Sequence, residues 1–422
     1  MTLHWFLSKK VRDATHMWKH VHKLVCSQRD LLTDEAIAKV DASIQALRGA
    51  IRIGAEKALL DTRMTELEAS ANKWLKPYPH AGFRENIEVL LVAIAVAMAI
   101  RTFIAQPFKI PTGSMQPTLY GVTSNPDFKD SYLPADGSLR PNPDFAIPPL
   151  WQRFFIYWFS GVGYDQVVAK EDGAMESVED VPKKFLLFNL YQDFKVGNQT
   201  YRVWFPPDNM LKRAGLSDRG GRANPRRFKK GEDLIKLRSI SGDHLFVDRV
   251  TFNLRRPERG DIVVFETHGI TRLPRDQQDT YYIKRLVGLG GEELQVGNDR
   301  HLRINGQRID ANTPHFEFLY SFDPSQPPAD SKFSGHVNEA TANRFGRGNL
   351  APKFLTESDK FVLPPHHFLV MGDNTMNSSD GRTWGDFPQE RVIGKSCFVY
   401  WPIGGTMFNG EMRASRFGWA HR

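Results

Sequence analysis

The first part of the chain contains three stretches in which apolar residues recur at spacings of three and four. They cover residues 11–25, 37–51 and 60–74. One apolar stripe per stretch predicts three amphipathic helices. Gly49 and Gly54 weaken the second helix by about 1 kcal/mol each if they lie inside it. Packing of the helices on one another explains the stripes, and so does binding of a protein partner.

The most hydrophobic stretch is residues 89–100, which are apolar without interruption. Alone it makes about 18 Å of helix, short of a hydrocarbon core of about 30 Å, so a buried core helix is an alternative. Extended to residues 87–105 it reaches about 28 Å, provided that Glu88 and Arg101 direct their charges to the interfaces. We expect a transmembrane helix over 87–105. The flanking basic residues are too evenly divided to orient it.

Beyond residue 238, short alternating apolar runs are separated by turn residues, which is typical of strands. These runs cover 245–250, 261–265, 282–287, 294–296, 302–304 and 368–371. Asn305-Gly306 predicts a two-residue hairpin turn. We therefore expect a mainly β domain of antiparallel sheets, preceded by one transmembrane helix and an α-helical N-terminal region.

Residues 122–237 fit this pattern less well, because they are rich in Pro, Asp, Asn and Gly. A hairpin is expected around Gly197, and the segment reads as an insertion lobe. Within it, six of the ten residues of 150–159 are aromatic. Such a run is typical of a membrane interface, and a buried strand pair explains it equally well.

Composition narrows the class of protein. A length of 422 residues allows two to three domains. A mean hydropathy of −0.42 excludes a multi-spanning membrane protein, and 41% hydrophobic residues exclude a mainly disordered chain. The two cysteines, Cys26 and Cys397, are too few for a disulfide scaffold or a four-thiolate zinc site.

The net charge of +8 is concentrated in one place. Residues 209–230 hold eight basic side chains and one acidic one. No recognition helix, zinc finger or aromatic RNA-binding signature accompanies them, so we expect no nucleic-acid partner. Contact with anionic lipid headgroups is the better explanation.

Three segments could carry chemistry. Ser114 lies in a Gly-Ser-Met turn between Pro111 and Pro117, which stiffen the backbone. Lys284 lies in a predicted strand, on a face with Tyr282 and Leu286. There, burial would lower the lysine pKa and leave a neutral amine able to accept a proton. The third segment, residues 372–382, is a polar loop after a strand. Taken singly, these segments are equally well explained as an ordinary loop serine, a solvated lysine and a polar turn.

Together the segments resemble the type I signal peptidases, membrane-bound Ser-Lys proteases that remove signal peptides from exported proteins. The resemblance rests on five blocks in the family's order: residues 111–119, 242–247, 259–265, 282–289 with Gly291-Glu292, and Gly372-Asp-Asn with 377–382. It implies a signal-peptidase-like β domain formed by 106–121 plus 238–410, with a second β lobe at about 298–361. The resemblance does not extend to residues 1–85 or 122–237. From the residue pattern, 1–86 is the helical N-terminal region, 87–105 the transmembrane helix and 122–237 the insertion lobe.

The resemblance also implies roles for individual residues. Ser114 would be the nucleophile and Lys284 the general base, and the Ser114 N–H with the Thr112 hydroxyl would form the oxyanion hole. Ser378 would hold the lysine amine, with Asp380 paired to Arg382 and Asp373 supporting both. Shallow apolar pockets for the small substrate residues at −1 and −3 would be lined by Phe108, Ile110, Pro111, Met115, Leu119, Tyr282 and Ile283. No metal or cofactor is implied.

The resemblance further implies removal of signal peptides from preproteins after an Ala-x-Ala pattern. The location would be a bacterial inner membrane, crossed once, with the catalytic domain on the extracytoplasmic side. Two departures stand out: Thr375 and Met376 replace a charged pair in the polar loop, and about 120 residues separate Leu119 from Gly242. A membrane-tethered Ser-Lys protease with a specialised substrate is one alternative. A catalytically idle membrane-anchored assembly factor is another.

Overall fold

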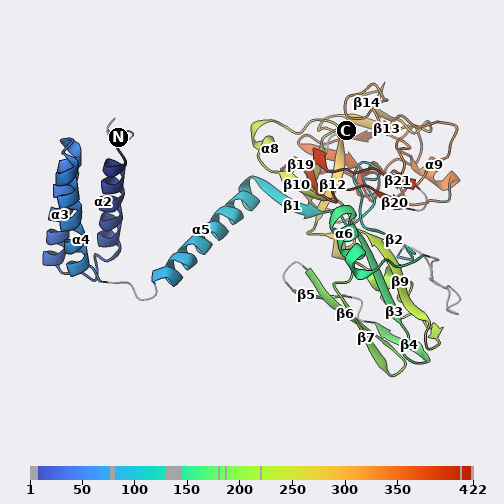
Figure 1. Ribbon diagram of the computed structural model, residues 1–422. Helices are drawn as coiled ribbons and strands as arrows, with labels where there is room; N and C mark the ends of the chain where they lie inside the picture. The colour runs from blue at the N-terminus through green and yellow to red at the C-terminus, as the bar shows by residue number, and fades with distance from the viewer. Residues whose placement is uncertain are drawn as a thin grey trace. The chain divides into compact units, whose positions relative to one another are not determined.

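The computed structural model describes residues 8–76, 81–129, 145–178, 181–185, 188–218, 221–408 and 411–419. It divides into two compact units, residues 1–96 and 97–422. Figure 1 labels the helices and strands in chain order.

The first unit contains the three predicted N-terminal helices. They are α2 (Lys9–Ser27), α3 (Asp34–Arg52) and α4 (Lys57–Trp74). Each apolar stripe faces the other two helices, and the buried residues include Ala14, Val40 and Leu67. The helices therefore pack on one another. Gly49 lies inside α3 and Gly54 lies beyond its end, with φ of 67°.

Helix α5 (Ala81–Phe103) covers residues 87–103 of the predicted span; it begins six residues earlier and ends two residues earlier than expected. Within it, Gly82–Phe103 is long and apolar enough to cross a bilayer, and none of its most apolar window is buried. The alternative of a buried core helix is therefore wrong. A single residue separates the end of this helix from Ala105, where the first strand of the β domain begins.

The largest sheet has eight strands, and its order runs β1-β10-β19-β11-β12-β17-β18, with β22 also paired to β19. All of its strand pairs are antiparallel. The strands are β1 (Ala105–Lys109), β10 (His244–Asp248), β11 (Ile262–Glu266), β12 (Tyr281–Gly288), β17 (His367–Met371), β18 (Phe387–Pro388), β19 (Val392–Trp401) and β22 (Gly418–Trp419). The expected mainly β, antiparallel class is confirmed. Buried side chains lie on both faces of this sheet and form separate clusters.

A smaller sheet of order β15-β14-β13-β16 lies between β12 and β17 in the chain. Its strands are β13 (Glu293–Val296), β14 (Leu302–Ile304), β15 (Gln307–Arg308) and β16 (Phe361–Val362). The predicted hairpin turn is present, because Ile304 pairs with Gln307 and both Asn305 and Gly306 have positive φ. The short helix α9 (Glu339–Arg344) belongs to the same stretch of chain.

The segment between β1 and β10 has its own strands and its own core. A three-stranded sheet joins β2 (Thr123–Asn125), β9 (Asp233–Ile240) and β3 (Val162–Val168). A five-stranded sheet joins β4 (Gly173–Val178), β5 (Lys183–Phe185), β6 (Phe188–Val196), β7 (Gln199–Trp204) and β8 (Arg227–Phe228). The expected hairpin around Gly197 joins β6 to β7. Figure 1 shows these strands extending together from the larger sheet.

The aromatic run folds as helix α6 (Leu150–Ser160), so the alternative of a buried strand pair is wrong. The basic run is also less exposed than its sequence suggests. Arg213 is buried and pairs with Asp127, and Arg226 is buried and pairs with Glu232. Arg219 lies outside the described residues. Only part of the predicted charge therefore faces water.

Candidate active site

The Ser114 turn follows β1 and is held by backbone contacts from distant segments. The Asn374 N–H donates to the Ser114 carbonyl at 3.0 Å, and the Asn374 amide donates to the Gly113 carbonyl at 3.0 Å. Close approach also requires glycine at position 121, where a Cβ atom would lie 2.2 Å from the carbonyl carbon and oxygen of Thr112. The turn is therefore fixed from both sides.

Lys284 approaches Ser114 from strand β12. Its ammonium nitrogen Nζ donates to Ser114 Oγ at 2.7 Å and to the Ile283 carbonyl at 3.0 Å. Nζ also lies 5.1 Å from the centre of the Tyr282 ring. The lysine is 4% exposed and the serine 6%. The structure thus brings together two residues that are 170 positions apart in sequence.

Burial lowers the pKa of Lys284 from 10.5 to about 8, although Asp380 and Asp373 act in the opposite direction. The charged ammonium loses its hydration in this site, which favours the neutral amine. At neutral pH about a tenth of the molecules would carry an amine that can accept a proton. The two carboxylates are stabilised elsewhere, and this limits their effect on the lysine.

Asp380 is neutralised by Arg382, as the sequence predicts. Arg382 donates to both carboxylate oxygens, through Nε at 2.9 Å and Nη2 at 2.8 Å, and both side chains are fully buried. The Gly372 N–H adds a bond to Asp380 at 2.9 Å. This pairing lowers the carboxyl pKa of Asp380 despite the burial that raises it.

Ser378 is buried beside this pair but does not bond to the lysine in this structure. Its hydroxyl has no hydrogen-bond partner of normal geometry among the described residues, although it lies close enough to Asp380 to help lower that pKa. A Cβ atom at position 372 would lie 2.2 Å from Ser378 Oγ and 2.4 Å from the Ser114 carbonyl oxygen. Ser378 and the Ser114 backbone therefore both pack against Gly372, where only a residue without a side chain fits. The predicted bond from Ser378 to the lysine amine stays a prediction.

Asp373 pairs with a residue that sequence reasoning missed. Arg285 donates to its carboxylate through Nε and Nη2, both at 2.7 Å, and Thr118 donates a further short bond. Both members of the pair are buried. Arg285 ties the loop to β12 on the strand face opposite Lys284, while Thr118 ties the loop to the serine turn. The sequence signal that could have identified Arg285 is its position in a predicted strand, on a face shared with the apolar Ile283 and Val287.

Thr375 and Met376, the two unusual residues of the polar loop, have definite structural roles. The Thr375 hydroxyl accepts from Arg382 Nη1 at 2.7 Å and from the Val337 N–H at 3.0 Å. Met376 packs with Val337 and Ala342 in a small apolar cluster. A threonine and a buried methionine thus support the loop in this chain.

The residues predicted to line the substrate pockets fall into two groups. Ile110, Met115 and Leu119 are at most 3% exposed and belong to the core beneath the serine turn. Facing outward are the partly exposed Phe108, Tyr282 and Ile283 and the exposed Pro111. The Phe108 ring meets the Tyr281 ring edge to face at 5.4 Å, which connects β1 to the start of β12.

The predicted oxyanion donors are not engaged elsewhere. Thr112 is exposed, and neither its hydroxyl nor the Ser114 N–H donates to any residue in the described part of the chain. Both donors therefore remain available to an acceptor that enters from outside.

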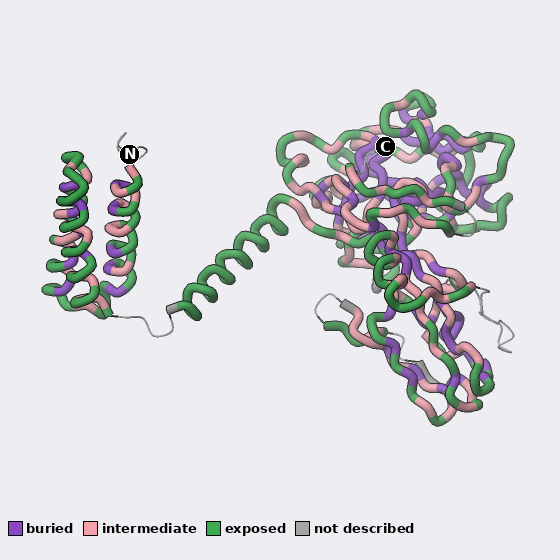
Figure 2. The backbone as a smooth tube through the Cα atoms, in the orientation of Figure 1, coloured by how far each residue is buried: buried purple, intermediate pink, exposed green. Residues whose placement is uncertain are grey.

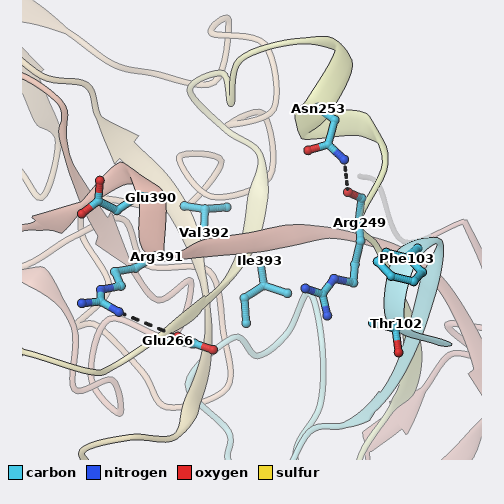
Figure 3. Close-up of a pocket in the computed structure, with 9 residues that line it drawn as sticks. All are labelled: Thr102, Phe103, Arg249, Asn253, Glu266, Glu390, Arg391, Val392 and Ile393. Atoms are coloured by element: carbon cyan, nitrogen blue, oxygen red, sulfur yellow. Dashed lines mark hydrogen bonds and ion pairs between the residues drawn. The ribbon is translucent and has the colours of Figure 1, made fainter. Parts of the chain in front are cut away.

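A separate hollow of about 350 Å³ lies at the end of α5 (Figure 3). Its walls include Thr102, Arg249 and Arg391, and Arg391 reaches toward Glu266 at 4.0 Å. None of the predicted site residues lines it. Across the described ranges, no three His, Cys, Asp or Glu side chains gather as a metal site.

Part of the chain is similar to known signal peptidases. The sequence model of a family described as "Signal peptidase, peptidase S26" matches residues 83–124 and 238–401. A signal peptidase I from Leptolyngbya laminosa is 28% identical over 177 residues, which cover 42% of this chain and 68% of that protein. A probable signal peptidase I-2 from Synechocystis sp. is 27% identical over 161 residues, covering 38% and 56%. A signal peptidase I from Bacillus amyloliquefaciens is 31% identical over 163 residues, covering 38% and 66%.

A solved structure, a signal peptidase I from Enterococcus faecalis V583, matches with 23% identity and a TM-score of 0.21. The match covers 33% of this chain and 97% of that one. The two ranges matched by the family leave out residues 125–237, which include most of the insertion strands. They include Ser114, Lys284 and the whole polar loop, and over these ranges the chain is similar to the peptidase S26 family of signal peptidases.

Proposed function

We propose that this protein is a signal peptidase I that cleaves exported preproteins after small residues through a Ser114–Lys284 dyad. The observation that carries the proposal is the 2.7 Å contact between Lys284 Nζ and Ser114 Oγ in a buried site that lowers the lysine pKa. A serine is a weak nucleophile until an adjacent base removes its proton. A neutral lysine at this distance is such a base.

The reaction follows from this contact. Lys284 takes the Ser114 proton as Oγ attacks the scissile carbonyl, and the ammonium then donates that proton to the leaving amine. The acyl group remains on Ser114 until water, deprotonated by the same lysine, releases it. The Ser114 N–H and the Thr112 hydroxyl, both unengaged, would bind the oxyanion. Loss of one such donor typically costs about 3 kcal/mol in the transition state.

The substrate would bind in an extended form along the free edge of β1. This strand is the first in the sheet order, and among the strands that the structure describes it pairs with β10 alone, so its other edge is open to strand addition. Phe108, Ile283 and Tyr282 present partly exposed apolar surface near that edge and the dyad. Buried Met115 and Leu119 fill the space beneath, which favours shallow pockets suited to small side chains.

The apolar helix supports a membrane location. Preproteins carry their signal peptides in the membrane, and α5 supplies one apolar helix directly before β1. We place the catalytic domain on the extracytoplasmic side of a bacterial inner membrane, with the three N-terminal helices on the opposite side.

The test uses the full chain in detergent with a preprotein that carries an Ala-x-Ala site. We expect Ser114→Ala and Lys284→Ala each to reduce kcat by at least about a thousandfold. Ser379→Ala and Lys360→Ala are matched controls, because both residues are exposed and neither is among the predicted catalytic or substrate-binding residues. We expect them to cleave at the wild-type rate. Cleavage retained by either dyad variant would refute the assignment, and an inactive wild-type chain would favour the idle assembly factor.

A further inference from the structure

Helix α6 has its polar side turned toward the protein and its apolar side turned outward. Gln152, Arg153, Ile156 and Ser160 are its only partly buried residues, and their spacing places them on one face. The remaining seven side chains are 47 to 78% exposed. One is Leu150, at the N-terminus of the helix, and the other six are aromatic: Trp151, Phe154, Phe155, Tyr157, Trp158 and Phe159. Figure 2 shows α6 mostly in the colour of exposed residues. A helix whose outer face is in contact with water would have the opposite arrangement, with apolar side chains toward the protein and polar side chains outward.

The inward face has partners that explain why polar residues point there. Arg153 donates a short bond to the Tyr164 carbonyl in β3. Arg153 also lies near the Asp165 carboxyl, which is half-buried and whose pKa is raised to about 6 by desolvation in spite of the arginine. The outward face therefore consists of the residues left over when these polar contacts are made.

The helix is rigidly attached to the sheet that carries the site. Trp401 Nε1 donates to the Trp158 carbonyl at 2.7 Å, and the Tyr157 and Trp401 rings lie 5.4 Å apart. Glycine is required at position 404, where a Cβ atom would lie 2.5 Å from the Phe159 ring. At the C-terminus of the helix, the Gly161 carbonyl accepts from the Ser241 N–H at 2.8 Å. The exposed aromatic surface is thus held in one orientation.

The position of α6 relative to the end of the membrane anchor is set by strand register. The chain leaves α5 at Phe103 and enters β1, whose five residues span about 17 Å. The last of them, Lys109, pairs with His244, and His244 pairs with Trp401 beneath α6. The helix is therefore attached about one strand length from the point where the chain emerges from the apolar span.

We propose that α6 lies in the surface of the lipid bilayer, with its aromatic outward face among the headgroups and upper acyl chains. Contiguous apolar surface of this kind is rare on a free protein surface, and Trp, Tyr and Phe favour the membrane interface. The short distance to the anchor makes the bilayer the surface that this face meets. This face would be a second membrane attachment of the β domain, in addition to the apolar span. The proposal rests on the anchor and α6, and it is independent of the dyad.

The test measures the depth of α6 in vesicles of phosphatidylethanolamine and phosphatidylglycerol that contain the full chain. In a Cys26→Ser, Cys397→Ser background, a nitroxide label is attached at Phe155→Cys on the outward face. Two matched labels serve as references: Thr200→Cys, exposed on β7, and Ile156→Cys on the inward face. Electron paramagnetic resonance then compares the accessibility of each label to oxygen, which concentrates in lipid, and to a water-soluble nickel chelate.

We expect the label at position 155 to have an oxygen-to-nickel accessibility ratio several-fold above that at position 200. A ratio at 155 equal to that at 200 would place α6 in water and overturn the proposal. Low accessibility to both reagents, as expected at 156, would mean that protein covers this face and would overturn it in favour of a second copy of the chain. Because no outcome depends on peptide cleavage, failure here is distinguishable from failure of the proposed function.

Discussion

Replacement of Gly372 by alanine tests the packing between the polar loop and the serine turn. The new Cβ atom would lie 2.2 Å from Ser378 Oγ, 2.4 Å from the Ser114 carbonyl oxygen and 2.7 Å from Ser378 Cβ. Ordinary contacts of this kind are about 3.5 Å, so something must move by about 1 Å. Gly372 does not have a positive φ, and the effect is therefore steric.

The magnitude follows from what has to move. One neighbour is the backbone of the proposed nucleophile, which Asn374 holds in place, so it cannot yield as a flexible side chain would. Overpacking a buried site typically costs about 1 to 3 kcal/mol of stability. A displacement of about 1 Å in a catalytic group lowers the rate about a hundredfold. We expect Gly372→Ala to show both effects.

The assay combines preprotein cleavage with thermal unfolding of the same preparation. Gly49→Ala is the matched control, because no atom lies within 4 Å of its Cβ position and it lies inside α3. That substitution should raise stability by up to about 1 kcal/mol and leave cleavage unchanged. Adding Ser378→Gly to Gly372→Ala removes two of the three close contacts and should restore part of the stability. A Gly372→Ala protein with wild-type cleavage and unfolding temperature would refute this account of the packing.

Four further predictions concern the buried polar and charged groups of the site. Cleavage should rise with pH through a midpoint of about 8, because the proposed base is the neutral form of Lys284. A rate that is constant between pH 6 and 10 would contradict this. The folded-state pKa of Lys284 lies below its unfolded value of 10.5. The free energy of unfolding is therefore about 3 kcal/mol lower at pH 7 than above pH 10.5, and it rises between pH 8 and 10.5. Lys284→Met should therefore unfold at a higher temperature than wild type at pH 7, with the gap closing as pH rises. Asp373→Asn leaves the buried Arg285 without its counter-charge and should lower stability by about 3 to 5 kcal/mol in urea titrations, whereas a loss below about 1 kcal/mol would show that the pair is not buried as described. Thr375→Val removes the acceptor for Arg382 and Val337 and should cost about 1 to 3 kcal/mol in the same measurement, with Thr356→Val, on an exposed loop, as the control.

The polar loop shows how far residue types alone can go. The pairing of Asp380 with Arg382 was predictable, because two opposite charges two residues apart in a turn-rich segment meet locally. The partner of Asp373 was not, because Arg285 is 88 positions away and reaches the loop only through the register of β12 with β17. The same holds for Thr118, which bonds to Asp373 across 255 positions. The predicted boundaries of the insertion and of the second β lobe stay predictions.

The basic run of the insertion shows the opposite case, in which sequence overstated a feature. Eight basic residues near one another suggest a charged surface, yet Arg213 and Arg226 turn inward to carboxylates from other parts of the segment. In α6 the direction of burial is inverted, and polar side chains face the protein. A helical period gives the two faces of a helix, but only its neighbours decide which face is buried.

The sequence by itself determined the helices of the N-terminal region, the apolar span, most strands of the β domain and the positions of the three candidate segments. These depend on local period, turn residues and short motifs, which act within a few residues along the chain. Tertiary structure decided that Lys284 Nζ lies 2.7 Å from Ser114 Oγ, that the lysine loses its hydration there, and that Gly372 leaves space for both serines. These depend on strand register and on burial, which are set by contacts between residues far apart in sequence.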